Sequence, residues 1–178
     1  MKGYAGHTGR LDVIIRSLIA SSTLDETCFI GLLGGLDRFD PQYIYSGDPS
    51  LYRNASEREL FQLVYRCFLR KSACGSLEIG SISIEYLANI VRKKGFNTIY
   101  LTEDGVDYCE SLGLLEGGGN LFLLGGHRDI PVEVLEIWGS DTHKMSIGPI
   151  PLHTSHVIYF ISTIMNRLKK GFKPCPGL

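Results

Sequence analysis

The sequence lacks the features that would mark a membrane or secreted protein. Its 178 residues contain no apolar run of 18 residues, so no membrane-spanning helix is predicted. No charged-then-apolar segment opens the chain, as a secretory signal would. The net charge is only −1, which argues against an obligate non-specific nucleic-acid binder, although a locally basic face remains open. We therefore expect a cytoplasmic protein.

The chain also lacks the motifs of several common ligand sites. Neither G-x-x-x-x-G-K-[ST] nor G-x-G-x-x-G occurs, so no phosphate-cradling loop is predicted. His153 and His156 are three residues apart but have no neighbouring carboxylate or cysteine, so we predict no metal site. No C-x-x-C pair occurs, and we interpret the cysteines as reduced thiols of an intracellular protein: Cys28, Cys67, Cys74, Cys109 and Cys175.

Charge is unevenly distributed along the chain. Residues 101–150 carry nine acidic and two basic side chains, whereas residues 151–178 carry four basic and no acidic ones. The acidic segment would repel phosphate and tolerate a positively charged ligand. A neutral or cationic ligand is therefore favoured for loops in this part of the chain.

Glycine is abundant, and the apolar residues follow regular patterns. The 21 glycines occur in short clusters, which mark tight turns. The length is typical of one domain. Apolar periodicity and capping signals predict helices over residues 11–22, from the Ser56-Glu59 capping box to about 68, and over 84–94, 132–137 and 154–170. Short apolar runs predict strands over residues 27–33, 42–46, 79–82, 97–101, 120–124 and 145–147.

The alternation of strands and helices predicts an α/β fold with a mostly parallel sheet. The run at residues 27–33 is apolar throughout, as in a strand buried on both faces. In such sheets, ligands bind beyond the carboxyl ends of the strands. These ends are residues 101–105, 124–127 and 146–149, and each contains glycine. The stiff loop at residues 147–152 could present its backbone to a planar ring, or it could be an ordered turn without a ligand.

Four stretches in these loops and at the start of the chain resemble a known family. They are Gly9-Arg10-Leu11-Asp12-Val13, Leu101-Thr102-Glu103-Asp104-Gly105, Leu123-Leu124-Gly125-Gly126-His127, and Ser-Ile-Gly-Pro-Ile-Pro-Leu-His at residues 146–153. The chain resembles the SPOUT superfamily of S-adenosylmethionine-dependent RNA methyltransferases, and more narrowly the archaeal tRNA pseudouridine-54 N1-methyltransferases. The resemblance implies a single α/β domain over residues 1–178 with a C-terminal deep trefoil knot. It also implies a homodimer with active sites at the subunit interface.

The resemblance further implies which residues form the site. S-adenosylmethionine would be held by Leu101, Gly125, Ile147, Gly148, Pro149, Ile150, Pro151, Leu152 and Val157. Asp12 is the candidate proton acceptor in catalysis, with a role as a first-turn helix acid as its alternative. Arg10 would assist at the catalytic site by contacting RNA phosphate. Arg53 and Arg58 are further candidate phosphate ligands, although a solvated helix end also explains them.

Three departures from the family pattern keep a second hypothesis open. Only nine residues precede Arg10, where the family usually has an extra strand; Gly126 replaces a frequent carboxylate, and Tyr45 replaces a frequent arginine. The alternative is a catalytically impaired S-adenosylmethionine- or RNA-binding module of the same fold, or a methyltransferase that acts on a different RNA.

Overall fold

The computed structural model describes residues 11–33, 41–70, 74–126, 129–172 and 174–175. The chain forms two compact units, Met1–Ser83 and Ile84–Leu178. Arg10 and His127 lie outside the described residues. Among the described helices, none has the length and apolar character needed to cross a membrane.

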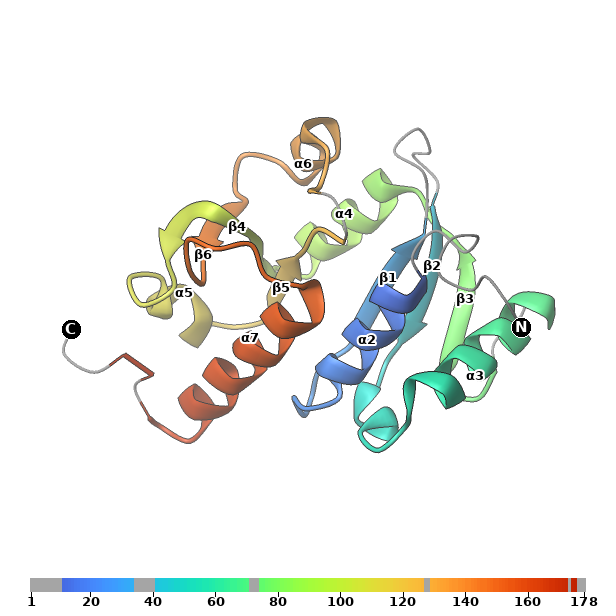
Figure 1. The fold of residues 1–178 in the computed structure, drawn as a ribbon. Coiled ribbons are helices and arrows are strands. Elements are labelled where there is room, and N and C mark those ends of the chain that lie inside the picture. Colours follow the sequence, from blue (N-terminus) through green and yellow to red (C-terminus); the bar gives the residue numbers. More distant parts are fainter. Residues whose placement is uncertain (1–10, 34–40, 71–73, 127–128, 173, 176–178) are drawn as a thin grey trace. The chain divides into compact units, whose positions relative to one another are not determined.

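The first unit consists of two helices packed on a three-stranded sheet (Figure 1). Its elements are α2 (Leu11–Ser21), β1 (Phe29–Leu33), β2 (Gln42–Ser46), η1 (Pro49–Tyr52), α3 (Glu57–Arg70) and β3 (Leu77–Ser81). The strand order is β1-β2-β3, and both pairs are antiparallel. Ile44 in the central strand pairs with Gly31 on one side and Ile79 on the other.

The core of this unit forms because both helices bury one apolar stripe. Ile15 and Leu18 of α2 and Leu60 and Val64 of α3 pack with Ile44 of the sheet, and all five are almost fully buried. The predicted capping box opens α3: the Ser56 N–H donates to Glu59 Oε2 at 2.8 Å, and the Glu59 N–H donates to Ser56 Oγ at 3.2 Å. The cap and the buried stripe therefore fix where α3 starts and which face it turns outward.

Two predictions for this unit are wrong. The sheet is antiparallel here, so the mostly parallel sheet predicted for the whole chain is found only in the second unit. The strand at residues 29–33 is not buried on both faces, since Gly31 is its only buried residue and Leu32 is 39% exposed. The helices cover one face of an antiparallel sheet, so a short apolar run can face outward at alternate positions.

The second unit contains a parallel sheet of three strands. Its elements are α4 (Ile84–Lys93), β4 (Asn97–Asp107), α5 (Leu112–Glu116), β5 (Asn120–Leu123), α6 (Val132–Trp138), β6 (His143–Ser146) and α7 (Thr154–Lys169). The strand order is β5-β4-β6, and both pairs are parallel as predicted. Figure 1 shows α5 and α7 on one side of these strands and α4 and α6 on the other.

The core under α7 joins the sheet to the last helix. Ile99 of β4 and Met145 of β6 pack with Leu115 of α5 and with Ile161 and Ile164 of α7. All five side chains are buried. This core holds the middle of α7 against the sheet.

The central strand is longer than predicted and contains a bulge. Met145 pairs first with Leu101 and then with Val106, so residues 102–105 are extra residues in β4. At Gly105, a Cβ would lie within 2.7 Å of backbone atoms of Met145. Glycine is therefore required here, because any side chain would push β6 away from β4.

Candidate functional site

The predicted cofactor loops meet at one edge of the second unit. The strands of this unit are parallel, so the ends of β4, β5 and β6 lie at the same edge of the sheet. The Tyr108 N–H donates to the carbonyl oxygen of Ser146 at 2.8 Å, which ties the end of β4 to the end of β6. The ends of the three strands therefore lie together, but residues 101–105, predicted as the loop after β4, are part of that strand.

The loop at residues 147–152 begins with a defined turn. The Ser146 hydroxyl donates to the carbonyl oxygen of Gly148 at 3.0 Å and accepts from the Gly148 N–H at 3.1 Å. Gly148 has φ +152°, which side-chain-bearing residues rarely adopt. A Cβ on Gly148 would meet no atom within 4 Å. The loop therefore leaves an open approach to its backbone at Gly148.

Thr154 connects the second predicted loop to the third, and the sequence analysis did not find it. Its hydroxyl donates to the carbonyl oxygens of Gly125 at 2.7 Å and Gly126 at 3.1 Å. This pair of bonds holds the end of β5 against the first turn of α7. The two glycines are 28 and 29 residues away in the sequence, so the position of Thr154 alone gave no sign of this role.

The predicted cofactor residues divide into two groups by burial. Leu101, Ile147 and Val157 are partly buried and pack against the core under α7. These three partly buried side chains can form the floor of a ligand site, and the more exposed side chains of the loop can cover an apolar ligand. Gly125 contributes only backbone, because it has no side chain. Ile150 is 70% exposed. The exposed loop side chains are those of Pro149, Ile150, Pro151 and Leu152.

Tyr100 lies within β4 directly before Leu101, and its hydroxyl stays protonated. Burial raises the pKa of Tyr100, and the negative charge of Asp129 raises it further. A hydrogen bond with Thr102 acts on the pKa in the opposite direction. Tyr100 therefore contributes a neutral hydroxyl beside Leu101 at physiological pH.

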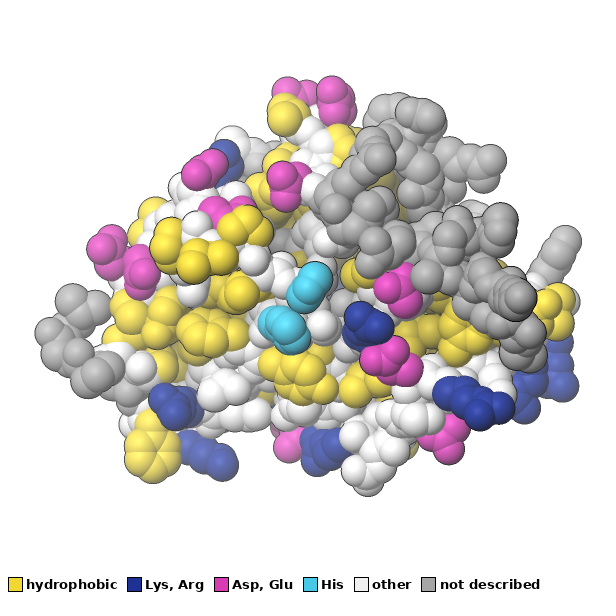
Figure 2. Space-filling model, in the orientation of Figure 1, with side chains coloured by type: hydrophobic (Ala, Val, Ile, Leu, Met, Phe, Trp, Pro, Cys, Tyr) yellow, Lys and Arg dark blue, Asp and Glu magenta, His cyan; other side chains and the backbone are white. Residues whose placement is uncertain are grey.

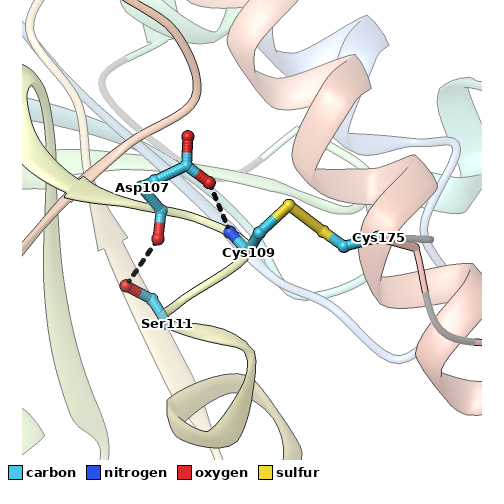
Figure 3. Close-up of a disulfide and its surroundings, with 4 residues drawn as sticks. All are labelled: Asp107, Cys109, Ser111 and Cys175. Atoms are coloured by element: carbon cyan, nitrogen blue, oxygen red, sulfur yellow. Dashed lines mark hydrogen bonds between the residues drawn. A yellow bond between two sulfur atoms is a disulfide. The ribbon is translucent and has the colours of Figure 1, made fainter. Parts of the chain in front are cut away.

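A disulfide bond crosses the second unit, so the prediction that all cysteines are reduced is wrong. Cys109 and Cys175 are bonded, with their Cα atoms 5.9 Å apart (Figure 3). The turn that carries Cys109 is fixed by Asp107, whose carboxylate accepts from the Cys109 N–H at 2.8 Å. The bond fastens the segment after α7 to the turn after β4. Sequence reasoning missed it because the two cysteines are 66 residues apart.

The predicted catalytic carboxylate lies in the first unit, at a cavity between α2 and α3. Asp12 and Arg58 were predicted as site residues, and the structure brings them to this one cavity. Phe61, Gln62 and Tyr65 were missed, although Phe61 and Tyr65 have helical i, i+4 spacing. The cavity has a volume of about 520 Å³ and is lined by Asp12, Ile15, Glu57, Arg58, Phe61, Gln62 and Tyr65.

Arg53 is engaged with its own unit rather than aimed at this cavity. Its Nε donates to the carbonyl oxygen of Ser22 at 3.0 Å, and its Nη2 donates to Asp25 Oδ1 at 2.7 Å. These bonds tie the residue after η1 to the end of α2. Part of the hydrogen-bonding capacity predicted for phosphate is therefore used inside the protein.

The surface in Figure 2 mixes hydrophobic, acidic and basic side chains. His153 and His156 contact each other edge to face, with ring centroids 5.5 Å apart. Within the described residues, no group of three histidine, cysteine or acidic side chains could hold a metal ion. These two histidines therefore form an aromatic contact at the start of α7.

Comparison with known proteins identifies the family. Residues 1–170 match the family described as "Putative SAM-dependent RNA methyltransferase". A protein named tRNA (pseudouridine(54)-N(1))-methyltransferase from Methanococcoides burtonii is 30% identical, over 93% of this chain and 87% of its own. The chain belongs to this family of S-adenosylmethionine-dependent RNA methyltransferases. A methyltransferase of the same name from Aeropyrum pernix is 29% identical, over 92% of this chain and 84% of its own.

A solved structure shares the fold of this methyltransferase. The crystal structure of Archaeoglobus fulgidus Nep1 bound to S-adenosylhomocysteine matches 96% of this chain and 77% of that protein, with a TM-score of 0.67 and 18% identity. At this identity the likeness concerns the fold. It supports the α/β architecture with a parallel sheet that the sequence predicted.

The strand ends of the methyltransferase fit the cofactor that the family uses. S-adenosylmethionine carries a planar purine and a positively charged sulfur. The open backbone at Gly148 suits the edge of a ring, and the exposed apolar side chains of the loop suit its faces. The acidic composition of residues 101–150 suits the positive charge.

Proposed function

We propose that this methyltransferase transfers a methyl group from S-adenosylmethionine to N1 of pseudouridine at position 54 in the T-loop of tRNA. The relatives from Methanococcoides burtonii and Aeropyrum pernix are named for this activity, and this chain matches most of their length. The observation that carries the proposal is the loop at residues 147–152, whose backbone is exposed at Gly148 beside the ends of β4 and β5.

The cofactor is held by the edge of the parallel sheet. Main-chain groups of the loop bind the adenine edge, and the partly buried Leu101, Ile147 and Val157 form the apolar floor. Gly125 stays in place through the bond from Thr154. When bound, S-adenosylmethionine supplies an activated methyl group, so the protein's main task is alignment of donor and acceptor.

Asp12 takes the proton from the ring nitrogen of the acceptor base. An imide-type N–H must share its proton before the nitrogen can attack a methyl group, and a carboxylate within hydrogen-bond reach is a suitable acceptor. Asp12 lies in the first turn of α2 and lines the cavity of the first unit. Arg10, Arg53 and Arg58 contact RNA phosphates, and of these Arg58 is at the same cavity as Asp12.

The family resemblance also supports proposals about assembly. We propose that the two units act as one SPOUT domain, that the C-terminal segment is threaded as a deep trefoil knot, and that two copies form a homodimer in the cytoplasm. The close approach of Gly105 to the backbone of Met145 is in keeping with a threaded chain, in which backbones pack more tightly than side chains permit.

The test of this function measures methyl transfer from labelled S-adenosylmethionine. Label should enter tRNA that carries pseudouridine at position 54 and not the same tRNA with uridine there. Asp12→Asn should reduce turnover about 100-fold or more, as expected for loss of a general base. Its affinity for S-adenosylhomocysteine should equal that of the wild type.

Two results would contradict the proposal. Full turnover in Asp12→Asn would remove this residue as the proton acceptor. Cofactor binding without label in any RNA would favour the binding module, a hypothesis to which Gly126 gives weight because it stands where the family often has a carboxylate.

A further inference from the structure

The cavity between α2 and α3 has the size and lining of a ligand site. Its volume of about 520 Å³ falls within the roughly 300–1,000 Å³ that small-molecule pockets occupy. Its lining combines apolar surface from Ile15, Phe61 and Tyr65 with a few polar groups. This combination is typical of small-molecule sites.

An aromatic pair forms one wall of the cavity. Phe61 and Tyr65 lie one helical turn apart on α3, with ring centroids 6.5 Å apart and ring planes at 12° to each other. Tyr65 is 49% exposed, so part of this wall is accessible from solvent. Exposed aromatic rings in RNA-binding proteins take unpaired bases by stacking.

The polar groups of the cavity specify which edge a base can present. Glu57 is engaged by Arg16, whose Nε donates to Glu57 Oε1 at 3.1 Å. Asp12 and Gln62 are the other acidic and amide groups of the lining. A carboxylate only accepts hydrogen bonds, whereas an amide both donates and accepts. The lining therefore suits a ring edge that has both N–H and carbonyl groups, and pseudouridine has two ring N–H groups where uridine has one.

Basic residues lead away from the cavity along the same helix. Arg58, Arg66 and Arg70 are all exposed on α3, and Arg66 and Arg70 are four residues apart, so these two are neighbours on the helix surface. Figure 2 shows dark blue side chains gathered over this helix. Positive charges in a row can follow an RNA backbone. The lining has two carboxylates, of Asp12 and Glu57, and one guanidinium, of Arg58, so a base suits its interior better than a phosphate does.

We propose that this cavity binds one unpaired pseudouridine base of the RNA, stacked on Phe61 and Tyr65, with the adjoining phosphates on Arg58, Arg66 and Arg70. The identity of the base rests on the proposed function. Phe61, Gln62 and Tyr65 are substrate-binding residues in this inference, and Tyr65 supplies the stacking surface that is easiest to remove without disturbing the core.

The test compares RNA affinity in variants of the full chain. A hairpin RNA with one pseudouridine in its loop is titrated into each protein, and its dissociation constant is measured by fluorescence anisotropy at one salt concentration. Tyr65→Ala should bind at least about fivefold more weakly, as expected for loss of one stacking contact. Tyr65→Phe should stay within about twofold of the wild type, since the ring is retained. Tyr86→Ala, which removes a 62% exposed tyrosine of the second unit, is the matched control and should bind as the wild type does.

Gln62→Ala and a uridine hairpin complete the test. Gln62 is exposed, so its replacement does not threaten the fold, and it should reduce affinity for the pseudouridine hairpin. The wild type should prefer pseudouridine over uridine, and Asp12→Asn should lessen that preference. Melting temperatures of all variants should match the wild type.

Several outcomes would overturn the inference. One is wild-type RNA affinity in both Tyr65→Ala and Gln62→Ala. Another is a loss of RNA affinity in Tyr86→Ala as large as that in Tyr65→Ala. A third is a change of oligomeric state in Tyr65→Ala, measured by sedimentation, which would assign the cavity to a second copy of the chain. Methyl transfer that proceeds in Tyr65→Ala with unchanged KM would overturn the inference and leave the proposed function intact. RNA binding that depends on Tyr65 but is not followed by methyl transfer would support the inference and contradict the proposed function.

Discussion

Replacing Gly105 by alanine tests whether the bulge in β4 is as tightly packed as the structure requires. The added Cβ would lie 2.6 Å from the nitrogen and 2.7 Å from the Cα of Met145, and closer still to its carbonyl carbon. Carbon atoms in contact prefer separations of about 3.5–4.0 Å, so β6 would have to move by about 1 Å from β4. Met145 is fully buried in the core under α7, so the movement cannot be confined to the surface.

The cost follows from general values for overpacking. Forced insertion into a packed core costs about 1–3 kcal/mol, and the obstacle here is backbone, which places Gly105→Ala near about 3 kcal/mol. Alanine also reduces the conformational freedom of the unfolded chain, which offsets about 0.4–1 kcal/mol of this loss in the free energy of unfolding. The net loss is about 2 kcal/mol, and for a chain of this size it lowers the melting temperature by about 4–8 °C.

The assay is a thermal melt followed by circular dichroism, with Gly113→Ala as the matched control. Gly113 lies within α5, and a Cβ there would meet no atom within 4 Å, so alanine should stabilise the helix by about 0.5–1 kcal/mol. Opposite shifts in the two variants are expected. A Gly105→Ala protein that melts at or above the wild-type temperature would refute the packing described for β4 and β6.

Two further predictions concern the cysteines. Replacing both Cys109 and Cys175 by serine should lower the free energy of unfolding by about 2–4 kcal/mol, because the disulfide closes a long loop. Reductant should leave the melting temperature of this double variant unchanged. The control Cys28→Ser, at an exposed free cysteine, should melt as the wild type does. Burial, with a smaller effect of neighbouring Cys74, raises the pKa of Cys67 to about 12. In the unfolded chain a cysteine thiol has a pKa of about 8.5. The buried neutral thiol therefore makes its full contribution to the free energy of unfolding below that pH, and this contribution is lost as the pH rises toward 12. Denaturant unfolding between these pH values should therefore show a steeper decline in the wild type than in Cys67→Ala, and equal slopes would contradict the burial of this thiol.

The helices and most strands could be predicted because their signals are local. The apolar spacing of residues 11–21 and the pairing of Ser56 with Glu59 each depend on neighbours within one or two turns. The structure confirms both. Strand direction could not be predicted in the first unit, since it depends on how β2 pairs with β1 and with β3, on the far side of α3 in the sequence. The five-residue apolar run of β1 is equally compatible with either direction.

The candidate site was predictable in part for the same reason. Glycine after β5 and β6 indicated the edge where these strands end beside β4, although Gly105 lies inside β4 rather than after it. The extension of β4 through residues 102–107 was missed, because acidic residues and glycine are typical of a loop. The bond from Thr154 to Gly125 and the disulfide of Cys109 were missed because they join residues far apart in the chain.

The central claim is that the loop at residues 147–152 binds the cofactor, and calorimetry with S-adenosylhomocysteine tests it most directly. The wild type should release or absorb heat on titration, and Gly148→Val should not, because its branched side chain would enter the space left open at Gly148. Gly171→Val is the control, since Gly171 also has a positive φ and open surroundings but lies after α7. Cofactor binding in the wild type and Gly171→Val, with none in Gly148→Val, is the predicted result. Wild-type affinity in Gly148→Val, or no heat in the wild type, would contradict the account.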